Sequence, residues 1–181
     1  AGARKALVWL DFDPSTSGLL CWLQGGYFTN DRKALLAPLM LKFDAPWAWE
    51  AMDIVAVVFE LGFLVVMFFR RYWTLWLIIW CLFHAFNTLV LNIGFNINIP
   101  LILAFVPWSV LFSRRMSAAV PASWLPLSLL VLAGVSVLAT TRPVSRWLGG
   151  PMGMSALEVM RLFTTLAWCC LAVVFLRVYV Q

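Results

Sequence analysis

The sequence predicts an all-α membrane protein: a polytopic bundle of about five transmembrane helices with short interfacial or re-entrant segments. Three observations predict it. Hydrophobic residues make up 64% of the chain and charged residues only 12%, about half the charged share of an average soluble domain. The mean hydropathy is +0.93. A chain this apolar carries more apolar surface than a soluble fold of its length can bury. The apolar residues also gather in runs of about 20, the length that crosses a hydrocarbon core.

The amino-terminal part of the chain contains only short apolar segments. Residues 1–10 are typical of the end of a helix, and the turn-rich stretch 11–18 stops that helix. Because the chain begins inside this helix end, we expect an amino-terminal part to precede it. Two short segments follow. One is broken by Gly25-Gly26, and the other, too brief to span, is expected to lie at the interface or to re-enter the membrane. They are 19–26 and 35–41, the second flanked by Lys33 and Lys42.

Five longer apolar runs are predicted to cross the membrane. The third run contains Pro100 and Pro107, and a loop rich in Gly and Pro at 142–153 separates the fourth from the fifth. The five runs are 47–69, 72 to about 94, 97–112, 123–141 and 160–180.

The basic residues lie at the ends of these runs, so the net charge of +5 indicates membrane topology and not nucleic-acid binding. Arg70-Arg71, Arg114-Arg115 and Arg177 fall on one side, which the positive-inside rule assigns to the cytoplasm. We expect this membrane to be the bacterial inner membrane. The residues predicted on or near the opposite side are Arg32, Lys33, Arg142, Arg146 and Arg161.

Tryptophan and cysteine have simple interpretations in such a bundle. Many of the eleven Trp residues lie near segment ends, where they favour an aromatic belt at the membrane interface. The cysteines show no CxxC or metal-like spacing and are interpreted as small core residues without disulfides. The belt positions are Trp47, Trp49, Trp73, Trp108 and Trp124, and the cysteines are Cys21, Cys81, Cys169 and Cys170.

Polar side chains within the spans need a reason, because a charge at membrane depth costs about 2.5–3.5 kcal/mol. Glu50, Asp53 and Glu60 are spaced by three and then seven residues, so they share one stripe of the first span. His84 and Asn87 share a stripe of the second. We expect Glu50, the outermost of the acids, to be solvated at the interface.

Counting about 1.5 Å per residue from the turn at Arg70-Arg71 places Glu60 at the depth of His84, and Asp53 at the depth of Asn87. The two helices therefore predict a shared polar pocket. Interhelical pairing that only holds the bundle together is an equally open interpretation. For His84, structural hydrogen bonding, a catalytic or ligand-orienting role, and ligation of a pigment or metal all stay open. A single His is a poor metal site, and we predict none.

Arg4 and Lys5 are charged residues inside an apolar stretch. Both side chains can snorkel to the headgroups from a helix end. Alternatively, an apolar surrounding favours the neutral lysine amine, which can then act as a base.

Three parts of the chain resemble one family. The run Ala1-Gly2-Ala3-Arg4-Lys5-Ala6-Leu7 resembles the A-G-x-x-K-x motif of the vitamin K-dependent γ-glutamyl carboxylases and their bacterial relatives, the HTTM (horizontally transferred transmembrane) domain proteins. Phe83-His84-Ala85-Phe86-Asn87, followed by Ile93-Gly94-Phe95, is similar to the family's F-H-x-x-N segment and G-x-F-like turn. Glu60 in Phe59-Glu60-Leu61 resembles its acidic position.

The resemblance covers residues 1–115 and implies the carboxyl-terminal half of such a membrane domain. Residues 116–181 do not match; they add two further transmembrane helices with a Gly/Pro loop, and the family's large lumenal or periplasmic domain has no counterpart.

The resemblance also implies a chemistry. Lys5 would be the base that deprotonates a reduced isoprenoid naphthoquinone. In the family, oxygenation of that hydroquinone gives a stronger base that removes a γ-proton from glutamate before CO₂ adds. His84 and Glu60 would join Lys5 as catalytic residues. Asp53, Asn87 and Arg4 would bind the substrate.

Two other functions stay open. The small soluble part, the many Trp residues and one intramembrane His also suit a non-catalytic accessory subunit of a larger membrane complex that handles quinones, haem or pigments. Its partners would be membrane lipid and other membrane subunits, not nucleic acid. A transporter is suggested only by the Pro-broken third run and its Asn-rich start, and no repeat of hydropathy between the two halves of the chain supports it.

Overall fold

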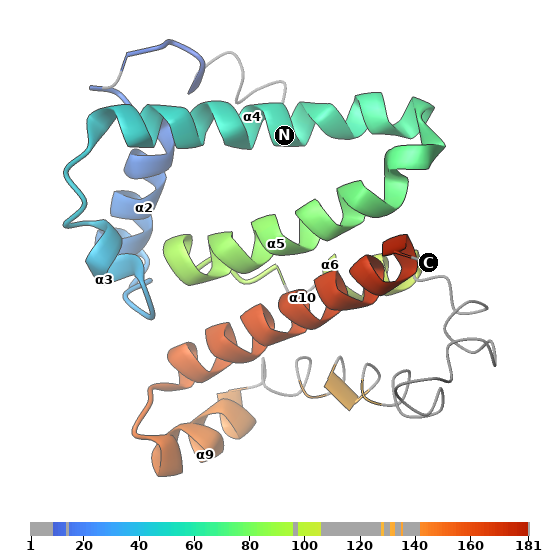
Figure 1. Cartoon of the computed structure of the whole chain (residues 1–181). Coiled ribbons are helices and arrows are strands. Elements are labelled where there is room, and N and C mark those ends of the chain that lie inside the picture. The colour runs from blue at the N-terminus through green and yellow to red at the C-terminus, as the bar shows by residue number, and fades with distance from the viewer. Residues whose placement is uncertain are drawn as a thin grey trace.

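The structure is a computed structural model in which every described element is a helix and no described residue lies in a strand (Figure 1). It describes residues 9–13, 15–95, 98–105, 128, 131–132, 135 and 142–180. The helices are α2 (Gly18–Thr29), α3 (Ala37–Met40), α4 (Pro46–Phe68), the 3-10 turn η1 (Arg70–Tyr72), α5 (Trp73–Leu91), α6 (Asn98–Leu103), α9 (Arg142–Met152) and α10 (Ala156–Val180).

Three of the described helices are long and apolar enough to cross a membrane: α4, α5, and α10 over Ala156–Leu176. They confirm the first, second and fifth predicted runs and indicate a membrane-embedded helical protein. The prediction of five spans is not confirmed. Within the run 97–112 only α6 and two following residues are described beyond residue 97, and most of 123–141 lies outside the described residues.

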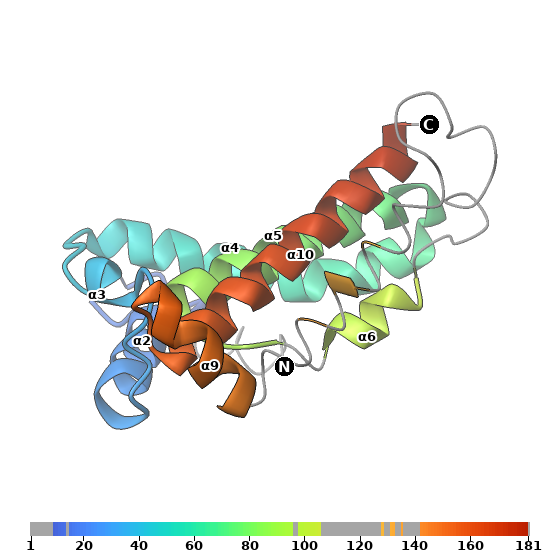
Figure 2. The same ribbon diagram turned by 90° about the horizontal axis from the view of Figure 1, so that it is seen from below.

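The three long helices alternate in direction, and α5 lies between α4 and α10 in Figure 1. Helix α10 packs along most of α5, and their shared core includes Cys81, Trp168 and Phe175. Helix α4 diverges from α5, as Figure 1 shows, and most of its surface is exposed apolar side chain, as expected of a helix in contact with lipid. The carboxyl end of α10 lies beside the turn between α4 and α5 (Figures 1 and 2).

The contact between α4 and α5 is made by aromatic rings. Phe59 of α4 stacks between two rings of α5, with centroid distances of 4.8 Å to Trp76 and 4.2 Å to Phe83. Gly62 lies one turn further along α4, where an added Cβ would be 2.7 Å from a ring carbon of Trp76. The absence of a side chain at Gly62 therefore lets the indole approach the α4 backbone.

Helix α2 is anchored across α4 by a buried carboxylate. Asp53 is 0% exposed. Its Oδ2 accepts a hydrogen bond from the N–H of Gly18 at 2.8 Å, and its Oδ1 accepts one from Leu19 at 2.7 Å. These N–H groups belong to the first turn of α2, which has no intrahelical acceptors for them. The negative charge also lies at the positive end of the helix dipole. Asp53 is thus a cap supplied from a distant part of the chain.

The predicted break of the segment 19–26 at Gly25-Gly26 is wrong, because α2 continues through both glycines to Thr29. The Gly26 carbonyl accepts hydrogen bonds from the N–H groups of Asn30 and Arg32 at 3.2 and 3.0 Å. An added Cβ at Gly26 would be 3.1 Å from Cδ of Arg32. This glycine therefore allows the returning chain to pack closely against the helix.

The predicted loop at 142–153 is also wrong, because most of it forms helix α9. Pro151 lies in the last turn of α9, and Gly153 ends the helix with a φ of +63°. The N–H of Met154 donates to the Gly149 carbonyl at 2.9 Å. A left-handed glycine after the last turn is a common helix stop, so the Gly and Pro residues here terminate a helix.

Helix α10 begins at Ala156, four residues before the predicted start at 160. Ser155 and Glu158 form a reciprocal cap: the Glu158 N–H donates to Ser155 Oγ at 3.2 Å, and the Ser155 N–H donates to Glu158 Oε2 at 2.7 Å. This Ser-x-x-Glu capping box was readable in the sequence.

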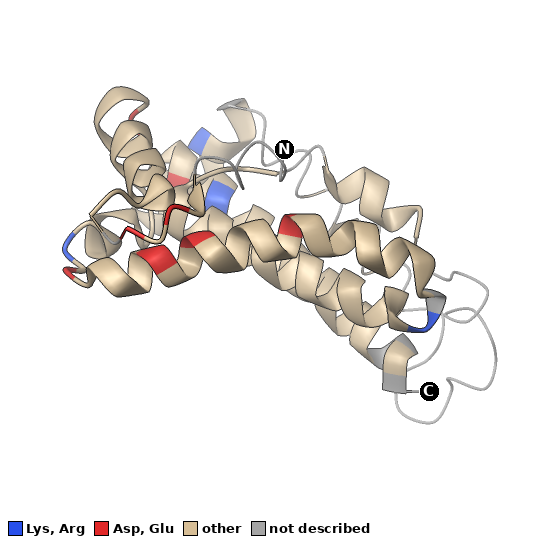
Figure 3. Cartoon of the chain, turned by 90° about the horizontal axis from the view of Figure 1, so that it is seen from above, with Lys and Arg blue, Asp and Glu red and all other residues tan. Residues whose placement is uncertain are grey.

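The membrane-interface predictions for single residues hold only in part. Trp47 is 72% exposed at the start of α4, but Trp49 is 1% exposed and its indole N–H donates to the Phe43 carbonyl at 3.0 Å. Glu50 is 2% exposed, so its predicted solvation is wrong; the segment around Phe12 lies beside it. The basic residues that the structure describes lie toward the two ends of the bundle (Figure 3). Trp108 and Trp124 lie outside the described residues. Among the cysteines only Cys81 is buried, so the interpretation as core residues is wrong for Cys21, Cys169 and Cys170.

Replacing Asp53 by Ala should destabilise the protein by about 3 kcal/mol, because two buried N–H groups of α2 lose a charged acceptor. The measurement is denaturant or thermal unfolding of the purified protein in detergent. Asp44→Ala, at an exposed acid just before α4, is the matched control and should stay within about 0.5 kcal/mol of the original. Equal stabilities for the two variants would contradict the role of Asp53 as a cap.

Candidate functional site

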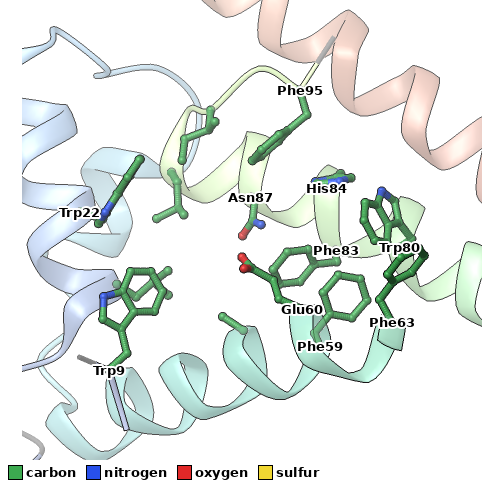
Figure 4. Close-up of a pocket in the computed structure, with 14 residues that line it drawn as sticks. Trp9, Trp22, Phe59, Glu60, Phe63, Trp80, Phe83, His84, Asn87 and Phe95 are labelled. Atoms are coloured by element: carbon green, nitrogen blue, oxygen red, sulfur yellow. The ribbon is translucent and has the colours of Figure 1, made fainter. Parts of the chain in front are cut away.

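A cavity of about 520 Å³ lies between α2, α4, α5 and the segment that follows α5 (Figure 4). Aromatic side chains make up half of its lining residues, and three lining residues are polar. The aromatic residues are Trp9, Trp22, Phe59, Phe63, Trp80, Phe83 and Phe95; the polar ones are Glu60, His84 and Asn87; the aliphatic ones are Leu19, Ala56, Leu91 and Ile93.

The three polar side chains come from two helices and line one wall region of the cavity, with His84 on the side of Trp80 (Figure 4). Glu60 projects from α4, and His84 and Asn87 project from adjacent turns of α5. In Figure 4 the Glu60 carboxylate and the Asn87 amide point toward one another across the cavity. The depth count paired Glu60 with His84, and both residues line this cavity, but the residue opposite Glu60 is Asn87.

The other predicted site residues are not in this group. Asp53 does not line the cavity, and both of its oxygens accept hydrogen bonds from the start of α2. The predicted partnership of Asp53 with Asn87 is thus replaced by a cap. Arg4 and Lys5 lie outside the described residues.

His84 is surrounded by rings. It is 6% exposed, and its ring centroid lies 4.3 Å from Phe95, 4.9 Å from Trp168 and 5.2 Å from Trp80. Neither ring nitrogen has a hydrogen-bond partner among the described residues. The structural hydrogen bonding that one interpretation of His84 requires is therefore not found in the described part of the chain.

Local hydrogen bonds fix the end of α5 over the cavity. The Thr88 hydroxyl lies 2.8 Å from the His84 carbonyl and 3.1 Å from the Ile93 carbonyl. Asn92 ends the helix in the left-handed region, with a φ of 55°, and its amide donates to the Ala34 carbonyl. An Asn tolerates this conformation better than most residues. The turn directs Ile93 and Phe95 into the cavity lining.

Sequence reasoning missed Trp80 as a member of the site. Its indole N–H is buried and has no acceptor among the described residues. Trp80 lies one turn before His84 on the same face of α5, and this spacing was a readable signal. Buried polar atoms without partners are rare and ask for an explanation, such as a ligand or an ordered water.

A metal centre has no support within the described residues, where no three His, Cys, Asp or Glu side chains come together. The cavity instead has the character of an organic binding site: a mainly aromatic lining with a few polar groups at one place. Scans against models of protein families, curated proteins and solved structures found no match to this chain.

Replacing His84 by Phe should leave the stability of the ligand-free protein unchanged or raise it by about 1 kcal/mol, because a ring of similar size replaces unpaired buried nitrogens. Unfolding in detergent measures this change. Thr88→Val is the comparison, since its hydroxyl lies within bonding distance of two carbonyls, and it should cost about 1 kcal/mol. A loss of about 2 kcal/mol or more in His84→Phe would restore the structural interpretation of the histidine.

Proposed function

We propose that this is an integral membrane protein of the HTTM or vitamin K-dependent carboxylase-like type, and that its cavity binds a reduced isoprenoid quinone. The observation that carries the proposal is the convergence of Glu60, His84 and Asn87 in an aromatic cavity. These are also the residues in which the sequence resembles that family.

The chemistry of the cavity suits a hydroquinone. Its flat apolar ring can stack on the aromatic lining. Its oxygens need donors and acceptors, and the Asn87 amide offers both while the Glu60 carboxylate accepts. An apolar cavity of about 150 Å³ holds benzene, so a bicyclic quinone head of about 13 heavy atoms needs roughly 300 Å³. The cavity of about 520 Å³ has room for that head.

The proposed reaction begins with proton transfer. A neutral lysine amine takes the proton of a hydroquinone hydroxyl and leaves a hydroquinone anion. Lys5 is assigned as this base by its place in the A-G-x-x-K-like motif, with Arg4 next to it. Glu60 and His84 would orient and polarise the ring oxygens during the transfer. The protein would thus be a quinol-linked membrane enzyme.

We also propose that the protein lies in the bacterial inner membrane with Arg70-Arg71 and Arg114-Arg115 in the cytoplasm. The arrangement of the helices is consistent with this topology. The carboxyl end of α10, which carries Arg177, lies beside the turn between α4 and α5. Membrane lipid would be the main partner of the exposed face of α4.

A second candidate function is a non-catalytic accessory subunit that binds a haem or another pigment. It is favoured by one observation: the nitrogens of the buried His84 ring form no hydrogen bonds within the described chain. Purification in mild detergent distinguishes the two candidates. A coloured protein that co-purifies with other subunits would favour this one.

Replacing Asn87 by Leu should weaken quinone binding by about tenfold or more, because a quinone carbonyl loses the Asn87 N–H donor in a mainly apolar cavity. The measurement is quenching of Trp fluorescence by a soluble naphthoquinone titrated into the protein in detergent. Asn30→Leu, at the exposed end of α2, is the control and should bind as the original does. Undiminished binding by Asn87→Leu would remove this residue from the site.

Replacing Lys5 by Ala should lower quinol-dependent turnover by about 100-fold or more, the usual contribution of a general base. Binding of the oxidised quinone should persist, because the amine acts on the proton and not on the ring. Turnover is measured by absorbance as the oxidation of the reduced quinone by dissolved O₂ in the presence of the purified protein, with the protein-free rate subtracted. A Lys5→Ala protein that folds and turns over normally would refute the assignment.

A further inference from the structure

A second cavity of about 220 Å³ lies beside the first. Phe63 of α4 and Trp80 of α5 line both cavities. Phe63 lies one turn after Glu60, and Trp80 lies one turn before His84. These two rings therefore separate the second cavity from the polar residues of the first.

The partition consists of rings in edge-to-face contact. The centroids of Phe63 and Trp80 lie 5.7 Å apart, with an interplanar angle of 63°. Phe63 is half-buried, and it is one of the two rings that both cavities share.

The second cavity is almost wholly apolar. Trp73 and Phe105, whose ring centroids lie 5.6 Å apart, line its far side, and the exposed side chains of Leu101 and Phe105 leave that side partly open to the surroundings. Asn98 is its only polar lining residue among the residues the structure describes. An apolar space of this kind favours hydrocarbon over water.

We propose that the two cavities form one binding site in two chambers, and that the second chamber selects ligands by the length of an apolar chain. The polar ring of the ligand lies beside Glu60 and Asn87, and its chain passes between Phe63 and Trp80. On the scale of benzene in 150 Å³, the second chamber takes about nine carbon atoms, or roughly two isoprene units. The inference rests on the proposed function and adds a preferred chain length to it.

The test compares methylnaphthoquinones that carry no isoprene unit, two units or four units, titrated into the full chain in detergent. The original protein should bind the two-unit compound about tenfold or more tighter than the compound without a chain, because buried apolar carbon adds affinity. It should gain little further from four units. Leu101→Trp fills the second chamber, which Leu101 lines from an exposed position, and should bring this ratio close to one.

Leu64→Trp is the matched control, since Leu64 is an exposed leucine of α4 that lines neither chamber; it should keep the ratio of the original. Phe105→Ala enlarges the second chamber and should shift the preference to the longer chain. The two-chamber site would be overturned if Leu101→Trp kept the affinity ratio of the original protein and Phe105→Ala showed no shift toward the longer chain. Quinone binding itself would still stand in that case. If none of the three compounds binds the original protein, both the site and the proposed function fail.

Discussion

The arrangement of the candidate site depends on the two hydrogen bonds that Asp53 accepts from the start of α2. A carboxylate at 0% exposure in an apolar helix is costly unless its charge is paired or fully hydrogen-bonded. The first turn of a helix supplies both donors and a positive dipole end. The cost of burying Asp53 is therefore lowest when α2 lies across α4. That position brings Leu19 and Trp22 to the cavity, so a structural bond determines which side chains form its wall.

The cavity exists because α4 and α5 are held apart by rings. Phe59 stacks between Trp76 and Phe83, while close helix packing is concentrated between α5 and α10. Stacked rings are wide, and two helices that meet through them leave space along the rest of their contact. The nitrogens of His84 and Trp80 beside this space have no hydrogen-bond partner within the described residues, and a buried polar atom without a partner costs free energy. Such a local loss of stability is typical of sites that are arranged for a ligand.

Helical periodicity and depth counting predicted the features that depend only on the position of a residue along its own helix. They located three membrane helices, because the length of an apolar run is read directly from the sequence. The depth count paired Glu60 with His84, whereas the structure sets Glu60 opposite Asn87. Periodicity and depth counting did not find the partner of Asp53, which lies 34 residues away in the chain. The error at Gly25-Gly26 has the same origin, since close packing against Arg32 decides the role of Gly26. The helix at 142–152 was missed for a different reason. Its Gly and Pro residues are typical of a loop, but here Gly153 ends one helix and the capping box after it begins the next.

The order of side chains along the cavity restricts the ligand independently of any family resemblance. The polar groups are confined to the middle of the cavity, where Glu60 faces Asn87 and His84 lies next along the wall toward Trp80. Aromatic residues lie on both sides of that region, Trp9 and Trp22 toward α2 and Phe63 and Trp80 toward the second cavity. A peptide or a sugar carries polar atoms along its whole length, and each one without a partner would cost free energy in such a space. A molecule with a single polar zone and apolar extensions has no such penalty. The geometry of the cavity thus favours an amphipathic ring compound on grounds that the motifs did not supply.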